Sequence, residues 1–138
     1  MKKLDVYLAD LLVGNVLLHN LHWNVYGFSF KAAHEYLEDL YDDFFKYFDD
    51  VAEYQKQKGV NPKASVKEYL ELSDLKELES KDVDQKEAIR IALDLVKHMK
   101  DHALEIRDEA DCFVLANMME DHVADFNKRI WFMESMVR

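Results

Sequence analysis

The chain has 138 residues, a length suited to one domain with its own core, so we expect a single domain over residues 1–138. Hydrophobic residues make up 49% and charged residues 33%, with three glycines and one proline, a composition that favours a compact, mostly helical chain. The formal net charge is -10. That charge attracts cations and disfavours binding to phosphate backbones and to anionic membranes.

The beginning of the sequence does not fit a secretory signal. Lys2 and Lys3 precede an apolar stretch, but Asp5 and Asp10 interrupt it and no small-residue cleavage site follows. The single cysteine, Cys112, has no partner for an internal disulfide, which is typical of a protein in the reducing cytoplasm. We therefore expect a cytoplasmic protein and read Cys112 as a small buried residue near a helix end.

The first helix is predicted from about residue 3 to about residue 25, because leucines recur there at helical spacing. Residues 11–30 carry no formal charge, and a run of that length is long enough to span a bilayer. The same run contains polar side chains, namely Asn15, His19, Asn20, His22, Asn24 and Ser29. Burial inside a helical bundle or oligomer explains it better than a membrane does.

Turn and capping signals mark the next two elements. Gly27 ends the first helix, and Ser29 is expected to cap a second helix that extends to about residue 57. Gly59 and Pro62 mark the turn after it. The pattern Ser65-x-x-Glu68 is a capping box, which predicts a short helix through residue 72.

The remaining chain predicts two further long helices. Residues 73–83 are polar and charged and are expected to form a loop, and Asp84-x-x-Glu87 is a second capping signal. No glycine or proline separates the third long helix from the fourth, and we place the break at residues 108–111. Four long helices with a long second connection predict an all-α, ferritin-like four-helix bundle with a short extra helix in that connection.

The stretch from residue 22 to residue 53 carries metal-binding side chains. Carboxylate and imidazole groups together suit a first-row metal such as iron, manganese or zinc. The chain has no Glu-x-x-His pair, the usual iron motif of helical bundles, so the prediction rests on geometry. On a helix, four of these side chains share one arc, at roughly 0°, 40°, 60° and 100° around the axis. In that order they are His34, Glu38, Asp49 and Glu53.

Distance along the helix decides how such a site can form. His34 and Asp49 lie roughly 22 Å apart along the axis, too far to bind one ion or a pair of ions. The two ends are therefore either unrelated half-sites or parts of a shared site. A second, antiparallel copy related by a two-fold axis near Tyr41 or Asp42 brings His34 to Asp49 and Glu53 of that copy. The spacing thus suggests a metal site shared between subunits.

Several stretches of the sequence resemble the Dps family, the ferritin-like DNA-binding proteins from starved cells. The resemblance covers nearly the whole chain, and the His…His…Asp-x-x-x-Glu spacing is its most specific feature. The matching residues are Leu21-His22-Trp23-Asn24-Val25 with Gly27, His34-Glu35, Asp49-Asp50-Val51-Ala52-Glu53, Ser65 to Leu72, and Ile130-Trp131-Phe132-Met133.

The resemblance implies a ferroxidase centre between two-fold-related subunits. One subunit is expected to contribute His22 and His34, and its partner Asp49 and Glu53. Family members often have Asp where this chain has Glu38, which is longer by one methylene and is included here as a candidate metal ligand.

The same resemblance implies an iron-oxidising, iron-storing mini-ferritin. Iron is oxidised at the shared site, with hydrogen peroxide as the expected oxidant, and is stored as ferric mineral in a hollow dodecamer, which protects against oxidative stress. Trp23 is a candidate electron donor beside the centre, although packing is the simpler role for it. Acidic residues of the fourth helix, Glu120, Asp121 and Asp125, could line an ion entry pore.

The sequence also allows other interpretations. His98 and His102 stand at i and i+4 and could chelate a metal, but with no supporting residue nearby in sequence they are interpreted as surface residues, and His19 as structural. A DNA-compacting protein is one alternative; the net charge and the absence of the Lys- or Arg-rich tail of DNA-binding family members argue against it. A structural or interaction bundle with a vestigial metal site is the other alternative.

Overall fold

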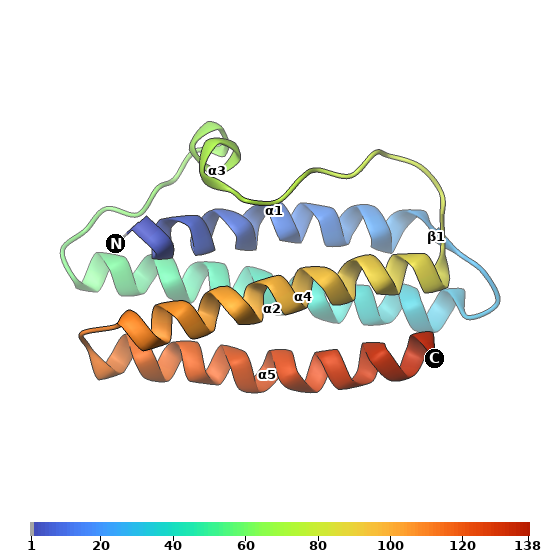
Figure 1. Cartoon of the computed structure of the whole chain (residues 1–138). Coiled ribbons are helices and arrows are strands. Elements are labelled where there is room, and N and C mark those ends of the chain that lie inside the picture. The colour runs from blue at the N-terminus through green and yellow to red at the C-terminus, as the bar shows by residue number, and fades with distance from the viewer. Residues whose placement is uncertain (1) are drawn as a thin grey trace.

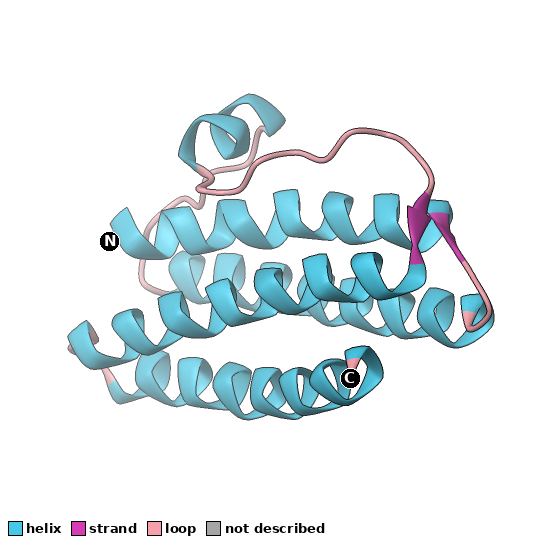
Figure 2. Cartoon of the chain, turned by 45° about the vertical axis from the view of Figure 1, so that its right-hand side comes forward, coloured by secondary structure: helices cyan, strands magenta, loops and turns pink. Residues whose placement is uncertain are grey.

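The computed structural model describes residues 2–138 and consists mostly of helices (Figure 1). Four long helices run side by side as a bundle, and a short helix lies outside it, against the first long helix (Figure 2). In chain order the elements are α1 (Lys2–Asn24), β1 (Val25–Tyr26), α2 (Phe30–Gln57), α3 (Val66–Leu72), β2 (Val83–Asp84), α4 (Gln85–Glu109) and α5 (Phe113–Val137). The predicted all-α, ferritin-like bundle with an extra short helix is confirmed.

The predicted break between the last two helices is also confirmed. α4 ends at Glu109 and α5 begins at Phe113, so the chain reverses without a glycine or proline. Ala110 and Cys112 take extended backbone angles there, which stops the helix. Cys112 is half-buried at the start of α5, so it is less enclosed than predicted.

Two of the three predicted helix caps form. The Ser65 side chain accepts a hydrogen bond from the Glu68 N–H at 3.3 Å, and the Asp84 side chain accepts one from the Lys86 N–H at 3.0 Å. The prediction for Ser29 is wrong, because its side chain makes no capping bond and its backbone is not extended. Its N–H instead donates to the side chain of Gln85 at the start of α4.

A short parallel strand pair, which the sequence did not predict, lies beside this contact. Val25 pairs with Val83 and Tyr26 with Asp84, so the turn after α1 is joined to the end of the long connection (Figure 2). Gly27 follows with φ of +134°, a backbone conformation that side-chain-bearing residues rarely adopt. The pair thus joins the turn that precedes α2 to the residues that precede α4.

The core lies between the apolar faces of the four long helices. By length and composition α1 passes as a possible membrane span, but 67% of its most apolar window is buried in the bundle. The helix also carries buried polar side chains that bond to neighbouring elements. The Nδ2 group of Asn15, for example, donates to the main-chain carbonyl of Tyr41 on α2 at 2.7 Å. The uncharged run of α1 is thus explained by burial in the bundle.

Candidate metal centre

His22 and His34 lie together where α1 ends and α2 begins. Their rings stack with centroids 3.7 Å apart and an angle of 13° between the planes. The Nδ1 atom of His22 is 2.6 Å from the main-chain carbonyl oxygen of His34, and the Nδ1 atom of His34 is 2.7 Å from the carbonyl oxygen of His22. The two residues therefore hold each other in place through reciprocal hydrogen bonds.

These bonds select the tautomer of both rings. A carbonyl oxygen can only accept a hydrogen bond, so each Nδ1 carries the hydrogen and each neutral ring keeps its lone pair on Nε2. Hydrogen bonds of this kind orient the histidines that bind metals in proteins. A carboxylate is also at hand, since Oε1 of Glu38 lies 3.8 Å from Nε2 of His22. The arrangement offers two nitrogen donors and one carboxylate to a cation.

Aromatic side chains surround this pair. Tyr41 presents its ring to His22 at a centroid distance of 5.2 Å and stacks on His19 at 3.7 Å. His19 bonds through Nδ1 to the main-chain oxygen of Asn15 at 2.8 Å, which agrees with a structural role. The ring of Trp23 contacts that of His19, with the centroids 5.3 Å apart, yet Trp23 is 68% exposed. Packing within the protomer therefore does not explain why a tryptophan is present at this position.

Asp49 and Glu53 lie in the other half of α2 and are both exposed. They stand one helical turn apart, and the negative charge of Asp49 is the largest cause of the raised pKa of Glu53. A bound cation would relieve this repulsion. Within one protomer the pair is separated from His34 by roughly 22 Å of helix, so the structure does not bring the two halves of the predicted ligand set together.

Comparison with known proteins places this geometry in a family. The ferritin-like domain family matches residues 1–138. A DNA protection during starvation protein from Helicobacter pylori is 31% identical over 130 residues, which cover 92% of this chain and 90% of that protein. The crystal structure of a Dps protein from Bacillus brevis superposes with a TM-score of 0.92 at 29% identity and covers 99% of this chain and 93% of that one. The chain belongs to the Dps family of ferritin-like proteins.

A further solved structure agrees closely with this fold. Antigen TpF1 from Treponema pallidum superposes with a TM-score of 0.95 at 29% identity, over 99% of this chain and 90% of that chain. The resemblance inferred from the sequence is thus confirmed at the level of family and fold.

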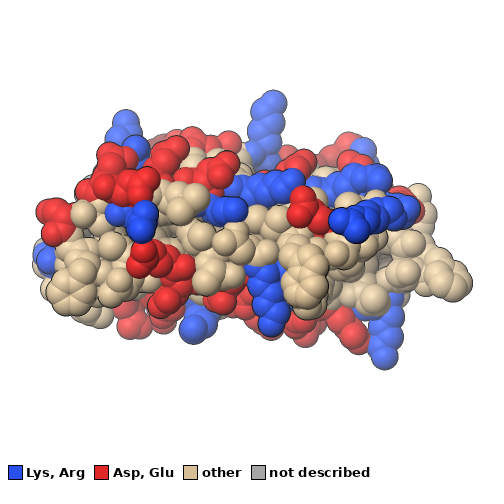
Figure 3. Space-filling model, turned by 60° about the horizontal axis from the view of Figure 1, so that its bottom comes forward, with Lys and Arg blue, Asp and Glu red and all other residues tan. Residues whose placement is uncertain are grey.

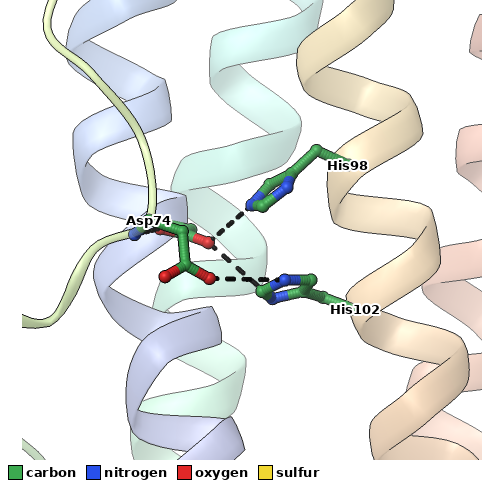
Figure 4. Close-up of side chains that lie close together, drawn as sticks. Asp74, His98 and His102 are labelled. Atoms are coloured by element: carbon green, nitrogen blue, oxygen red, sulfur yellow. Dashed lines mark hydrogen bonds and ion pairs between the residues drawn. The ribbon is translucent and has the colours of Figure 1, made fainter.

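A second group of possible metal ligands in this Dps-family chain was missed by the sequence analysis. Asp10, Asp74, His98 and His102 present ligand atoms that all lie within 4.8 Å of one another. Figure 4 shows the side chains of Asp74, His98 and His102 in this group. The interpretation of the two histidines as plain surface residues is therefore wrong. The i and i+4 spacing on α4 was visible in the sequence, but the nearness of Asp10 on α1 and Asp74 after α3 depends on the fold.

Three acidic residues of α5 were predicted to line a pore, and within the protomer they have different neighbours. Glu120 pairs with Arg107 of α4 at 3.0 Å, and Asp125 accepts a hydrogen bond from the hydroxyl of Tyr47. Asp121 lines an open depression between α2 and α5, together with Asp125. Asp121 and Asp125 thus share a depression that Glu120 does not line, and a pore in an oligomer stays a prediction.

Proposed function

We propose that this protein is an iron-oxidising and iron-storing mini-ferritin, with ferroxidase centres shared between two-fold-related subunits. The observation that carries the proposal is the reciprocal bonding of His22 and His34, which leaves the Nε2 lone pair of each ring available, with that of His22 beside Glu38. Membership of the Dps family and the ferritin-like fold support the same assignment. Fe(II) is the substrate, and the stored product is ferric mineral.

The donor types suit this chemistry. Imidazole nitrogens of His22 and His34 hold the incoming Fe(II), whereas the hard carboxylates of Asp49, Glu53 and Glu38 favour the Fe(III) product. Two Fe(II) ions each give one electron to one molecule of hydrogen peroxide, which takes up two protons and leaves as two molecules of water. Peroxide is thereby consumed without forming hydroxyl radicals, which is the basis of the proposed protection against oxidative stress.

The division of the ligands supports a shared site. Neither half of α2 holds all the proposed metal ligands. An antiparallel α2 of a partner subunit would place its second half beside the first half of this helix, and so complete the ligand set at both ends. Large apolar side chains on α1, α2 and α3 remain exposed in the protomer, among them Val16, Phe45, Val66 and Leu70, and a partner subunit would bury such side chains. We propose a hollow dodecamer in the cytoplasm, with Trp23, exposed beside the histidine pair, as an electron donor.

Co-assembly of two inactive variants tests the shared site directly. His34→Ala and Asp49→Ala should each abolish fast Fe(II) oxidation by peroxide while the fold is kept, because both side chains flank the apolar face of α2. In mixed oligomers, every pair that combines the two variants has one doubly damaged site and one intact site. Random pairing makes about half of the pairs mixed, so about a quarter of all sites regain a full ligand set. Fast oxidation, followed by absorbance, should return to that fraction.

The control is Asp39→Ala, which removes an exposed carboxylate from α2 without touching the proposed ligands and should leave oxidation unchanged. Distinct affinity tags confirm that the oligomers are mixed, and light scattering confirms their size. If each site lay within one chain, every chain would still hold a lesion and no activity would return. Absence of recovery in verified mixed oligomers, or a stable monomer at micromolar concentration, contradicts the shared centre.

A further inference from the structure

We propose that Asp10, Asp74, His98 and His102 form a second metal site, specific for a divalent first-row transition ion and contained within a single protomer. The site takes two imidazole nitrogens from α4, one carboxylate from α1 and one from the connection after α3. It is distinct from the inter-subunit centre in both position and ligands. It does not depend on the proposed iron oxidation.

The carboxylate of Asp10 forms the floor of this site. The residue is fully buried, and a buried carboxylate is costly unless its oxygens have partners. Oδ1 accepts hydrogen bonds from the Ser73 hydroxyl at 2.6 Å and from the Asp74 N–H at 2.9 Å. Oδ2 faces the two imidazoles, 2.8 Å from Nε2 of His98 and 3.8 Å from Nδ1 of His102. One oxygen is thus committed to the connection after α3, and the other is directed at the proposed metal position.

Asp74 closes the group from the solvent side. Its Oδ2 lies 3.4 Å from Nε2 of His102, and its side chain is about half exposed. His98 and His102 are also partly accessible, with their ring centroids 4.3 Å apart. These three side chains therefore have room to adjust around an ion, whereas Asp10 is fixed by its hydrogen bonds.

The donor set and its dimensions fit a small transition ion. Zinc takes nitrogen ligands at about 2.0–2.1 Å and carboxylate oxygens at about 2.0–2.2 Å in tetrahedral sites. Such bond lengths place neighbouring donor atoms about 3.4 Å apart. The donors here lie within 4.8 Å of one another, so the wider pairs have to move closer, whereas Nε2 of His98 and Oδ2 of Asp10, now 2.8 Å apart, have to separate slightly to admit an ion. Two imidazoles and two carboxylates suit zinc or cobalt better than calcium or magnesium, which prefer oxygen ligands alone.

An ion also has a route to this position. His102 and Asp74 line an open cavity of about 570 Å³ beside the start of α1, where Lys3 also lies, paired with Glu105 and Glu109. A bound ion would join α1, α4 and the connection after α3, which are remote in sequence. We expect it to hold residues 73–83 against the bundle.

Without a metal, the same four residues can bind a proton in place of an ion, since the hydrogen bond to Asp10 raises the pKa of His98. A dependence on pH would therefore not distinguish a metal site from a protonated network.

Metal binding is instead measured directly, in the full-length His34→Ala/Asp49→Ala protein, in which the inter-subunit centres are disabled. Titration with Co²⁺ should give the visible absorption of a tetrahedral site, saturating at one ion per chain, and Zn²⁺ should displace it. Adding His102→Asn should remove the absorption and weaken Zn²⁺ binding by roughly 10–100-fold or more.

A matched pair of carboxylate variants separates ligation from simple attraction. Asp74→Asn and Asp101→Asn each remove one negative charge near His98, but Asp101 is exposed and lies outside the group. Ligation predicts that only Asp74→Asn weakens Zn²⁺ binding strongly. Equal weakening by both variants, or no tetrahedral Co²⁺ absorption in folded background protein, overturns the proposal. If the background variant fails to assemble, the titration is done with the wild-type protein. There, His102→Asn must remove one class of metal sites, and His34→Ala must leave that class intact.

Discussion

At the scale of single residues, the environment of each histidine sets its chemistry. His122 of α5 is the most enclosed of those outside the two proposed sites, with 3% of its surface exposed. Its Nδ1 lies 2.8 Å from the hydroxyl of Tyr7, and its ring stacks on Tyr47 at 4.0 Å. Burial lowers the pKa of His122 to about 4, because the cost of a buried positive charge outweighs the attraction of Asp125, and Lys46 lowers the pKa further.

This shifted pKa predicts acid sensitivity. Below about pH 6.5 His122 is protonated in the unfolded chain but stays neutral in the folded chain. The free energy of unfolding therefore falls as the pH drops, and the loss is complete below about pH 4. The total loss is about 3 kcal/mol. The His122→Asn variant keeps a hydrogen-bond acceptor for Tyr7 but cannot be protonated there. Between pH 7 and pH 4 its free energy of unfolding, measured by urea at fixed protein concentration, should fall less than that of the wild-type protein, by this amount. Parallel pH profiles for the two proteins would contradict the prediction.

At the scale of secondary-structure elements, the close approach of α1 to α2 depends on Gly14. A Cβ atom at this position would lie 2.8 Å from Cε2 of Phe44 and 3.4 Å from Cδ1 of Leu95. Phe44 is fully buried in the core, so its ring cannot move aside. The absence of a side chain at Gly14 therefore lets two helices meet in the middle of the bundle.

Gly14→Ala is accordingly expected to destabilise the protein. Overpacking costs about 1–3 kcal/mol, which outweighs the gain of up to about 1 kcal/mol from replacing glycine inside a helix. Phe44→Leu should relieve the clash, so that the double variant is more stable than the sum of the two single changes predicts, by about 1 kcal/mol. Phe48→Leu, one turn further along α2, serves as the control and should give no such coupling.

At the scale of the whole molecule, negative charge dominates the surface. The formal net charge is -10, and on the face shown in Figure 3 acidic and basic side chains are interspersed rather than gathered into a basic patch. Binding to duplex DNA requires many lysine or arginine contacts with phosphates. The charge of this protein instead favours the attraction of cations such as Fe(II).

We therefore predict no binding to duplex DNA at physiological salt. A gel-shift assay with metal-free protein should show no retardation, and chelator must be present because divalent ions can bridge acidic side chains to phosphate. Retardation that appears only when divalent ions are added would identify such bridging. Retardation of DNA in the presence of chelator would refute the prediction and support a role in DNA compaction.

Local patterns in the sequence determined the secondary-structure elements and their order. Apolar spacing placed the four long helices, Ser65 and Asp84 signalled their helix starts, and residues 108–111 broke α4 from α5, because these features act within a few residues of the chain. The spacing of His34 and Asp49 showed in the same way that one helix cannot unite them. Only the tertiary structure decided which distant groups meet: the carbonyl that fixes each ring of the His22 and His34 pair, the strand pair beside them, and the approach of Asp10 to His98. Such contacts depend on how helices remote in sequence are packed, and no local pattern encodes that arrangement.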